Sequence, residues 1–518
     1  MTSKLLDRIG DWNPQLFREL KGYSNPVKIY SVIIGSFISQ FLVFMPLVSQ
    51  KCIEYDRGIC VQSEWLIYWE VIFRILDWML PLTLLVGGVY VLVGDLAKEE
   101  RQGTFNFIRL SPQSSQSILL GKTLGVPALL FLAIVLAIPL HFIAGLASDR
   151  PFLWILASYT FWGIGCCLFY WISLLYGLLY SKKIEPKSLA GTVSLVAFLL
   201  ALPYISAVDF SFDWYKANLV PKNWQWFFLP VGSQPELAYC LMIITIAIAS
   251  YWFWQAVNRR FCNPKAPLLS KKQSYWLVAS WQIFLLGFAL TNFNLNNRQI
   301  QDLVGFSFLF FLNPIFFVLL SVALVPDRQS VLDWTRYRRE TVSTKQSFWK
   351  SSLLQDLIWD ERSPAVVAIG INYLLATAIW LPWILLIIQT YLFENSETIL
   401  MLLAGLVLSM NAILIYALLP EFKRFLKPQH RWFLVLTVLG MILFPIVSWK
   451  IMGSSPIGLQ ILLLFSPFPV FSFVFNSIPT LLLGFVAQIT FLGFFGTQLT
   501  RQLKQAGETE TKAMLTGH

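Results

Sequence analysis

The sequence contains little charge and little histidine for a chain of its length. Only 13% of its 518 residues are Asp, Glu, Lys or Arg, while 56% are hydrophobic, a balance that excludes an ordinary soluble protein. The three histidines, His141, His430 and His518, stand far apart and form no His-x-x-x-His pair. The six cysteines show no metal-binding spacing. We therefore expect no metal site and no cofactor in this chain.

A phosphate-binding loop is also missing. Gly121-Lys122-Thr123 imitates the end of such a loop, but the motif needs a glycine five residues before the Gly-Lys pair, and position 116 is glutamine. Clustered catalytic carboxylates are absent from the apolar runs as well. The chain is therefore not expected to be an enzyme, and any ATP and Mg would be bound by a partner.

One close ionisable pair stands inside an apolar run. Arg74 and Asp77 are three residues apart and hence on one face of a helix. We expect an intramembrane ion pair that anchors this helix locally, and a contact to a substrate pathway is the alternative.

Long apolar runs are what the sequence has in abundance. Each is long enough to cross the hydrocarbon core of a bilayer as a helix. We expect an all-α, polytopic transmembrane protein of about twelve spans, arranged as two tandem six-helix units. The expected spans lie near residues 27–48, 69–94, 123–145, 153–180, 188–207 and 237–257, and near 275–293, 303–325, 366–391, 398–419, 432–452 and 480–500.

The segments outside the spans complete the predicted domain plan. Two aromatic or proline-broken stretches, 208–236 and 456–479, hold matching places in the two units and predict an outer re-entrant or aromatic element in each. If 456–479 crosses fully, the chain has thirteen spans. The plan is a cytoplasmic amphipathic interface helix at 1–26, a first six-span unit at 27–257, a cytoplasmic linker at 258–274, a second six-span unit at 275–500 and a cytoplasmic tail at 501–518.

The basic residues predict the orientation. Most of the 39 lysines and arginines fall in alternate hydrophilic segments that include both termini, and the rich side is expected to be cytoplasmic. The net charge of +11 is thus explained by topology, and no nucleic-acid partner is expected. No cleavable signal peptide is recognised, and we expect a multi-pass protein of a bacterial inner (plasma) membrane. Cys52 and Cys60 lie in a segment placed outside, where we predict a disulfide.

The hydrophilic segment between the second and third spans resembles a known family. It reads Glu99-Glu100-Arg101-Gln-Gly103-Thr104, then Leu110-Ser111-Pro112, then Ile118-Leu119-Leu120-Gly121-Lys122. This order resembles the cytoplasmic loop by which type-2 ABC transporter permease subunits dock on their ATPase. The stretch Asn13-Pro14-x-Leu-x-Arg18-Glu19-Leu20 resembles the N-terminal interface helix of that family. The resemblance implies a permease of two fused units.

A short docking helix is expected inside this segment, over 111–120. Serine is a good N-cap and proline suits the first helical position, so Ser111-Pro112 predicts its start. In the second unit Ser363-Pro364 holds the corresponding place and predicts a helix over 363–370, either degenerate or adapted to another partner surface, because no Gly-Lys follows. The candidate docking residues are Glu99, Glu100, Arg101, Gly103, Ser111, Pro112, Gly121 and Lys122, with Ser363 and Pro364.

The function that this pattern predicts is that of the membrane-spanning component of an ABC exporter. Its cargo would be hydrophobic, lipidic or bulky, and its partners would be two copies of an ABC ATPase subunit together with membrane lipids. Two alternatives remain open: a polytopic membrane enzyme acting on lipid-linked substrates, and a membrane scaffold that does not transport.

Overall fold

The chain divides into two compact units, which are described separately. Unit 1 comprises Met1–Lys222 with Val231–Pro264, and unit 2 comprises Asn223–Pro230 with Lys265–His518. The boundary at 264/265 falls inside the predicted linker 258–274. The computed structural model describes residues 8–23, 25–56, 59–216, 225–290, 305, 307–341, 352–391, 396–423 and 478–516.

Long apolar helices dominate the described residues, and the chain is an all-α, multi-pass membrane protein. Among these residues nine helices are long and apolar enough to cross a membrane, or ten if a bent pair, Phe308–Leu324 with Arg328–Arg336, is one span. The nine are Pro26–Leu47, Trp69–Gln102, Ala128–Ala147, Phe152–Tyr180, Pro186–Ala207, Pro235–Cys262, Val366–Gln389, Leu403–Phe422 and Leu482–Leu503.

The six expected spans of the first unit each match one of these helices. In unit 2 the expected spans at 366–391, 398–419 and 480–500 have counterparts, and 303–325 corresponds to the first part of the bent pair. The expected span at 275–293 is helical as far as it is described, to Leu290, but is not among the nine. The stretch 432–452 and residues 456–477 lie outside the described residues, so the predicted total of twelve spans stays a prediction.

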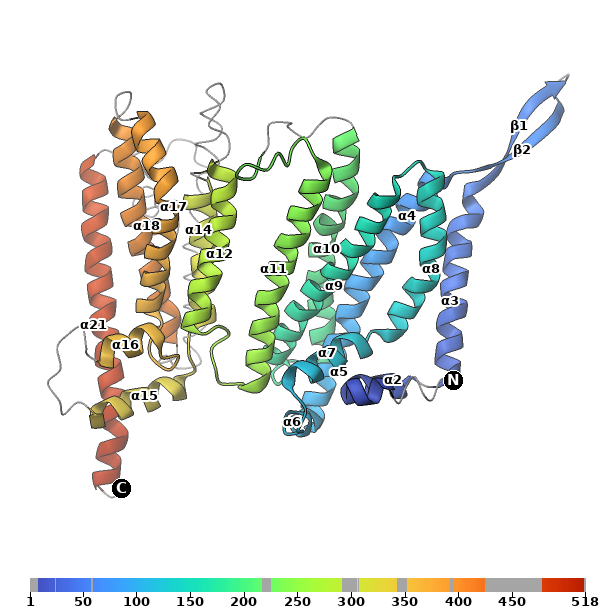
Figure 1. Ribbon diagram of the computed structural model, residues 1–518. Helices are drawn as coiled ribbons and strands as arrows, with labels where there is room; N and C mark the ends of the chain where they lie inside the picture. Colours follow the sequence, from blue (N-terminus) through green and yellow to red (C-terminus); the bar gives the residue numbers. More distant parts are fainter. Residues whose placement is uncertain are drawn as a thin grey trace. The chain divides into compact units, whose positions relative to one another are not determined.

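Unit 1 is a bundle of long helices with short helices at one end (Figure 1). Its elements in order are α2 (Pro14–Gly22), α3 (Pro26–Phe44), the 3-10 turn η1 (Met45–Leu47), β1 (Val48–Asp56), β2 (Ile59–Ile67), α4 (Trp69–Leu82), the π-turn η2 (Thr83–Gly87), α5 (Gly88–Gln102), α6 (Thr104–Arg109), α7 (Ser115–Gly125), α8 (Ala128–Ala147), α9 (Phe152–Tyr180), α10 (Pro186–Lys216) and α11 (Pro235–Cys262). Figure 1 shows α2, α6 and α7 together at one end, with the β1–β2 hairpin projecting from the other end of α3.

Local sequence explains where the first helices begin. Asn13 and Asn25 have extended backbones, and their side chains accept hydrogen bonds from Leu16 N and Val27 N. Each asparagine precedes a proline that occupies the first helical position. An N-cap side chain followed by proline is a strong helix start, and it fixes α2 and α3 as separate helices.

The second span of unit 1 continues well beyond the apolar run. The helical path from Trp69 to Gln102 contains 34 residues and includes a π-turn. The Tyr170 hydroxyl donates to the carbonyl of Leu84 in this turn, at 2.8 Å. Gly88 makes room for it, because a Cβ there would lie 2.0 Å from that oxygen. The buried side chains of Leu85, Val89, Leu92 and Leu96 then fix the direction in which α5 leaves the bundle.

The segment between the first two spans is an antiparallel hairpin, which the sequence did not predict. Its register runs from Val48 opposite Ile67 to Asp56 opposite Ile59. Cys52 faces Ser63 and Cys60 faces Tyr55 in this register, so the two cysteines are not direct cross-strand partners. Their side chains lie outside the described ones, and the disulfide stays a prediction.

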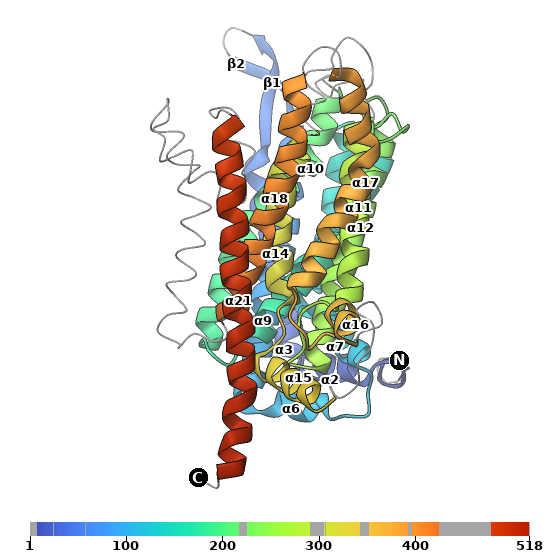
Figure 2. The same ribbon diagram turned by 90° about the vertical axis from the view of Figure 1, so that its left-hand side faces the viewer.

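The described part of unit 2 contains long helices, a π-turn and short helices. Its elements are α12 (Lys271–Leu290), the π-turn η3 (Phe308–Leu312), α14 (Asn313–Leu324), α15 (Arg328–Thr341), α16 (Ser352–Trp359), α17 (Val366–Tyr391), α18 (Ser396–Lys423) and α21 (Ile478–Thr516). Figure 2 shows α21 running beside α18 and past α15.

A buried amide network stabilises the core of unit 2. Gln282 and Asn313 exchange two side-chain hydrogen bonds of 2.8 and 3.0 Å, and Trp380 Nε1 donates to Gln282 Oε1 at 2.7 Å. All three residues are buried, and a satisfied polar network in a core favours one packing of α12, α14 and α17.

The expected outer element at 208–236 is partly helical. α10 continues to Lys216, and the described residues 225–230 pack on α12. Trp226 Nε1 donates to the carbonyl of Phe284 at 3.1 Å, and Phe227 N donates to that of Gly287 at 2.9 Å. Residues 225–230 therefore belong to unit 2, whereas the last residues of the expected element, from Val231 onward, belong to unit 1.

Candidate functional site: a lysine-centred interface segment

The resemblance-bearing residues form one connected structure, which we call the interface segment (residues 95–125). It begins in the last turns of α5, includes α6 and ends with α7. Its first residues continue a membrane span and its last residues lead directly into α8. A displacement of this segment would therefore act on spans at both of its ends.

Lys122 is the centre of the segment. Its side chain is fully buried, and its Nζ lies 2.7 Å from Asp95 Oδ2, 2.7 Å from Glu99 Oε2 and 3.5 Å from Glu19 Oε1. Burial by itself lowers the pKa of Lys122, but the charges of Asp95, Glu19 and Glu99 outweigh it, and the pKa is raised. The ammonium group stays charged and joins α2, α5 and α7.

The three carboxylates could in principle hold a metal ion. Oxygen atoms of Glu19, Asp95 and Glu99 lie within 4.8 Å of one another. The Lys122 ammonium group already contacts all three carboxylates, and Arg18 pairs with Glu19 and Glu99, so a metal ion would have to displace these cations.

Further contacts fasten α2 to α7. Asn13 Nδ2 donates to the carbonyl of Ser117 at 2.8 Å, and the Tyr23 hydroxyl donates to the carbonyl of Val126 at 2.9 Å. Arg18 adds an ion pair with Glu99 at 2.5 Å. The N-terminal helix is thus part of the same structure as the interface segment.

Two glycines of α7 allow this close approach. A Cβ at Gly121 would lie 2.7 Å from Asn13 Oδ1 and 2.8 Å from Leu16 N, and one at Gly125 would lie 2.6 Å from Glu19 Cβ. The Gly-Lys pair that suggested a docking surface is therefore used inside the protein. Gly121 accommodates α2, and Lys122 neutralises its carboxylate.

The predicted start of the docking helix is wrong by several residues. Ser114, not Ser111, is the N-cap: its backbone is extended, and its Oγ accepts from Ser117 N at 3.2 Å. Ser111 and Pro112 precede α7, and Ser111 Oγ donates to the carbonyl of Ile108 at 2.7 Å. The run Ser111-Pro-Gln-Ser114-Ser115 contains several serines that could cap a helix. Ser114 is the N-cap because it has the extended backbone that this position requires.

The charged residues 95–102 lie beyond the expected end of the second span at 94 and extend its helix. α5 ends at Gly103, whose φ of 75° lies in the left-handed region, a usual helix C-terminal conformation for glycine. Glu100 is nearly buried and lies 3.2 Å from Lys182 Nζ in the turn between α9 and α10. Arg101 is exposed.

The interface segment also contacts the end of α11, which the sequence did not predict. The guanidinium of Arg109 lies 4.7 Å from the ring of Phe105 and 5.5 Å from that of Phe261. The Ser115 hydroxyl donates to Asn258 Oδ1 at 2.6 Å. Phe261 is 152 residues from Arg109 and Asn258 is 143 residues from Ser115, and no local pattern marks these pairs.

The outer face of the segment exposes apolar side chains. Phe107 is 77% exposed and Leu110 is 84% exposed, and Arg101, Pro112 and Gln116 are exposed as well. The predicted docking residues therefore separate into two groups. Glu99, Gly121 and Lys122 hold the segment together, while Arg101 and Pro112 lie on its surface.

In unit 2 the predicted short helix at 363–370 is wrong. Ser363 and Pro364 are buried in the turn between α16 and α17, and residues from Val366 onward belong to the long helix α17. The short helix here is α16, which ends at Trp359.

A second buried lysine organises this turn. Lys271 Nζ donates to Ser363 Oγ at 2.5 Å, to the carbonyl of Leu357 at 2.7 Å and to that of Pro364 at 3.2 Å. Burial lowers the pKa of Lys271 to about 8, although Asp360, Glu421 and Asp356 act in the opposite direction. Here the lysine is surrounded mostly by backbone carbonyls.

The predicted pair of Arg74 and Asp77 has other partners in the structure. Arg74 forms an ion pair with Glu70 at 3.0 Å, and Asp77 Oδ1 lies 3.4 Å from His141 Nε2. Direct pairing of Arg74 with Asp77 stays a prediction. The role of His141 could not be predicted from the sequence, because its partners come from two other helices.

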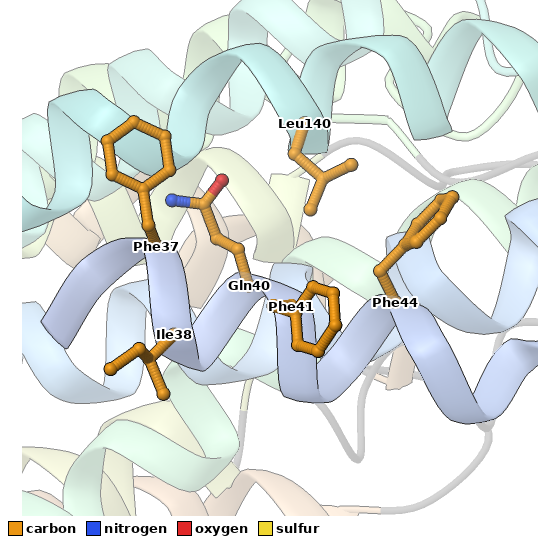
Figure 3. A pocket seen from close by; sticks show the side chains of 6 residues that line it. All are labelled: Phe37, Ile38, Gln40, Phe41, Phe44 and Leu140. Atoms are coloured by element: carbon orange, nitrogen blue, oxygen red, sulfur yellow. The ribbon is translucent and has the colours of Figure 1, made fainter. Parts of the chain in front are cut away.

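A shallow groove lies between α3 and α8 (Figure 3). It is lined by Phe37, Ile38, Gln40, Phe41, Phe44 and Leu140. The Gln40 amide nitrogen donates to Ser36 Oγ in the same helix at 3.2 Å and to the carbonyl of Leu136 in α8 at 3.3 Å, so it is already used within the protein. The exposed part is aromatic and aliphatic, as expected of a surface in contact with lipid.

Comparisons of the chain with known protein families, with curated proteins and with solved structures find no match. The family resemblance therefore rests on the residues of the interface segment and of α2.

Proposed function

We propose that this chain is the membrane-spanning component of an ABC exporter for a hydrophobic, lipidic or bulky cargo, powered by two copies of a separate ATPase subunit. The observation that carries the proposal is the exposed apolar tip, Phe107 and Leu110, on a charged segment that is rigidly tied to the membrane spans. Large apolar side chains exposed beside charged ones are typical of a protein-binding surface.

The contacts of Lys122 give this surface a mechanical role. An ATPase bound at the tip would move α5, α7 and α2 together, because Lys122 joins all three. The contacts of Glu100 with Lys182 and of Ser115 with Asn258 would carry the displacement to α10 and α11. Transport needs two arrangements of these spans with different affinity for cargo.

The two units support the proposal of two fused permease modules with twelve spans in all. Each has a π-turn in its second long helical segment, at 83–87 and at 308–312. Each continues through short helices, α6 and α7 or α15 and α16, into a long apolar helix. We propose that the short helices of both units face the cytoplasm, with both termini, in a bacterial inner membrane.

Purification of the tagged chain from its native membrane in mild detergent tests the proposal. An ATPase subunit should co-purify, and replacing Phe107 and Leu110 together by Asn should reduce its recovery about tenfold, as loss of central apolar contacts does. Trp65→Asn is the matched control, because Trp65 is 68% exposed but lies in the hairpin. Absence of any ATPase, or equal recovery with the double variant, would favour the scaffold or enzyme alternative.

A further inference from the structure

A strained aromatic turn, residues 226–229, lies in a part of unit 2 that the proposed function does not use. Trp226 and Leu229 exchange two backbone hydrogen bonds of 3.0 Å, which leave Phe227 and Phe228 as the central residues of a tight turn. The φ of Phe227 is 51°, in the left-handed region where a bulky side chain is strained. Tight two-residue turns usually have glycine, asparagine or aspartate at such a position. This turn instead keeps a phenylalanine there.

Contacts with α12 hold the turn in this conformation. Phe227 N donates to the carbonyl of Gly287 at 2.9 Å, and Trp226 Nε1 donates to that of Phe284 at 3.1 Å. Gly287 makes room for both rings, because a Cβ there would lie 2.8 Å from Phe227 Cε2 and closer still to Trp226 Nε1. Backbone strain persists only where the surroundings enforce it, and it is often part of a functional arrangement.

The result of these contacts is the exposure of Phe228. Its side chain is 96% exposed and that of Leu229 is 43% exposed, whereas Trp226 and Phe227 are partly buried. The two anchored residues therefore support the two exposed ones. An exposed phenylalanine contributes little to the stability of its own turn, and large apolar side chains held outward in this way indicate a contact surface.

The surroundings of the turn favour lipid as the partner of this surface. The sequence has no charged residue between Lys222 and Glu236, whereas a protein-binding patch usually has a polar rim. The turn packs near the far end of α12 from Lys271, and the membrane-spanning helix α11 begins at Pro235, six residues after Leu229. The ends of spanning helices lie at the level of the lipid headgroups, where phenylalanine and leucine insert into the acyl boundary.

We propose that residues 226–229 form a lipid-binding anchor, in which α12 holds the strained turn and Phe228 inserts between the headgroups and the acyl chains of the bilayer. Because Trp226 and Phe227 fasten the turn to α12, insertion of Phe228 sets the depth of this end of α12 in the membrane. Gly287 is the positioning residue, since the turn can seat on the helix only where a Cβ is absent. The anchor does not depend on the chain being an exporter.

Spin labelling of the full chain measures the depth of position 228. The six cysteines are replaced by serine, Phe228→Cys carries a nitroxide, and the purified protein is placed in vesicles of phosphatidylcholine and phosphatidylglycerol. Oxygen relaxes a label in lipid, and a water-soluble nickel chelate relaxes one in water. We expect the ratio of oxygen to nickel accessibility at 228 to exceed that of Asn106→Cys, an exposed position in α6, by about threefold or more.

Gly287→Ala, added to the labelled protein, tests whether α12 positions the anchor. It should displace the turn and lower the ratio at 228, whereas Gly493→Ala in α21, where nothing lies within 4 Å of a Cβ, should not. Equal ratios at 228 and 106 place Phe228 in water and overturn the proposal. A label at 228 that neither reagent reaches is covered by protein, which also overturns it, and an unchanged ratio in Gly287→Ala overturns the role of α12. If Gly287→Ala does not fold, the ratio at 228 without it decides.

Discussion

Lys122 and Lys271 are both buried, but their surroundings shift the pKa of the two amines in opposite directions. Three carboxylates surround Lys122 and raise its pKa, whereas backbone carbonyls surround Lys271, whose pKa burial lowers to about 8. The carboxylates compensate the charge of Lys122, so this lysine holds α2, α5 and α7 together. The charge of Lys271 is balanced only in part, so its burial is unfavourable while the amine is protonated. Substitutions at the two positions should therefore have different consequences.

Replacing Lys122 by Met should strongly destabilise unit 1. It would leave Glu19, Asp95 and Glu99 close together with only the partly exposed Arg18 as counter-charge, and breaking a buried ion pair on one side costs about 3 kcal/mol or more. Lys122→Arg retains the charge and should cost less. Thermal unfolding in detergent would measure both, and equal melting temperatures for Lys122→Met and the parent would contradict the role given to this lysine.

The Lys271 amine predicts a pH dependence of stability. Its pKa is about 8 in the folded chain, whereas the reference value for lysine is 10.5. Between these two pH values the unfolded chain therefore binds more protons at this residue than the folded chain does. As a result, the contribution of Lys271 makes the free energy of unfolding rise with pH. The rise is at most about 3 kcal/mol. Unfolding measured from pH 7.5 to 10 should show this rise in the parent and in Lys272→Met, an exposed control, but not in Lys271→Met. A parallel rise in Lys271→Met would contradict the assignment.

At the scale of elements, the contact of α2 with α7 decides the shape of the interface segment. Only a glycine fits at 121 and 125 without displacing α2, because the nearest atoms would lie under 3.0 Å from a Cβ. The sequence pattern identified Gly121 as part of a motif, but it did not single out Gly125 or show that both glycines allow α2 to pack on α7. A local pattern shows that a residue type matters, while the partner that requires it, here Asn13 or Glu19, lies about a hundred residues away.

Gly121→Ala should loosen α2 from α7. The clash with Asn13 and Leu16 should outweigh the helix-propensity gain of about 1 kcal/mol that alanine brings. Hydrogen exchange of the amides in Pro14–Gly22 should accelerate. Gly191→Ala in α10 is the control, because nothing lies within 4 Å of a Cβ there, and it should leave α2 unchanged. Unchanged exchange in Gly121→Ala would show that α2 is held elsewhere.

For the whole molecule, the hydrophobic composition predicted the positions of the spans best, and the local capping residues predicted helix starts least well. The apolar runs placed all six expected spans of unit 1, because crossing a bilayer demands a minimum length of apolar helix. The hairpin at Val48–Ile67 was missed, since strand pairing depends on register rather than on composition. Helix starts at Ser111 and Ser363 were misplaced because several nearby residues could cap, and tertiary packing chose between them.

The orientation of the molecule is a prediction at this scale. The hairpin and α6 should lie on opposite sides of the membrane, with α6 in the cytoplasm, as the distribution of lysine and arginine indicates. In a cysteine-free background, Glu64→Cys should react with an impermeant thiol reagent added to intact cells, and Asn106→Cys should not. Both positions are exposed in the structure, so labelling of Asn106→Cys from outside would invert the topology.

The most direct test of the central claim is photo-crosslinking from the tip of the interface segment in native membranes. A photoreactive amino acid at position 107, in place of the exposed Phe107, should capture a nucleotide-hydrolysing subunit, identified by mass spectrometry. The same probe at position 65 in the hairpin should not. Capture of an ATPase at 107 alone is the predicted result. Absence of an ATPase among the products at 107, or its equal capture at 65, would contradict docking at this segment.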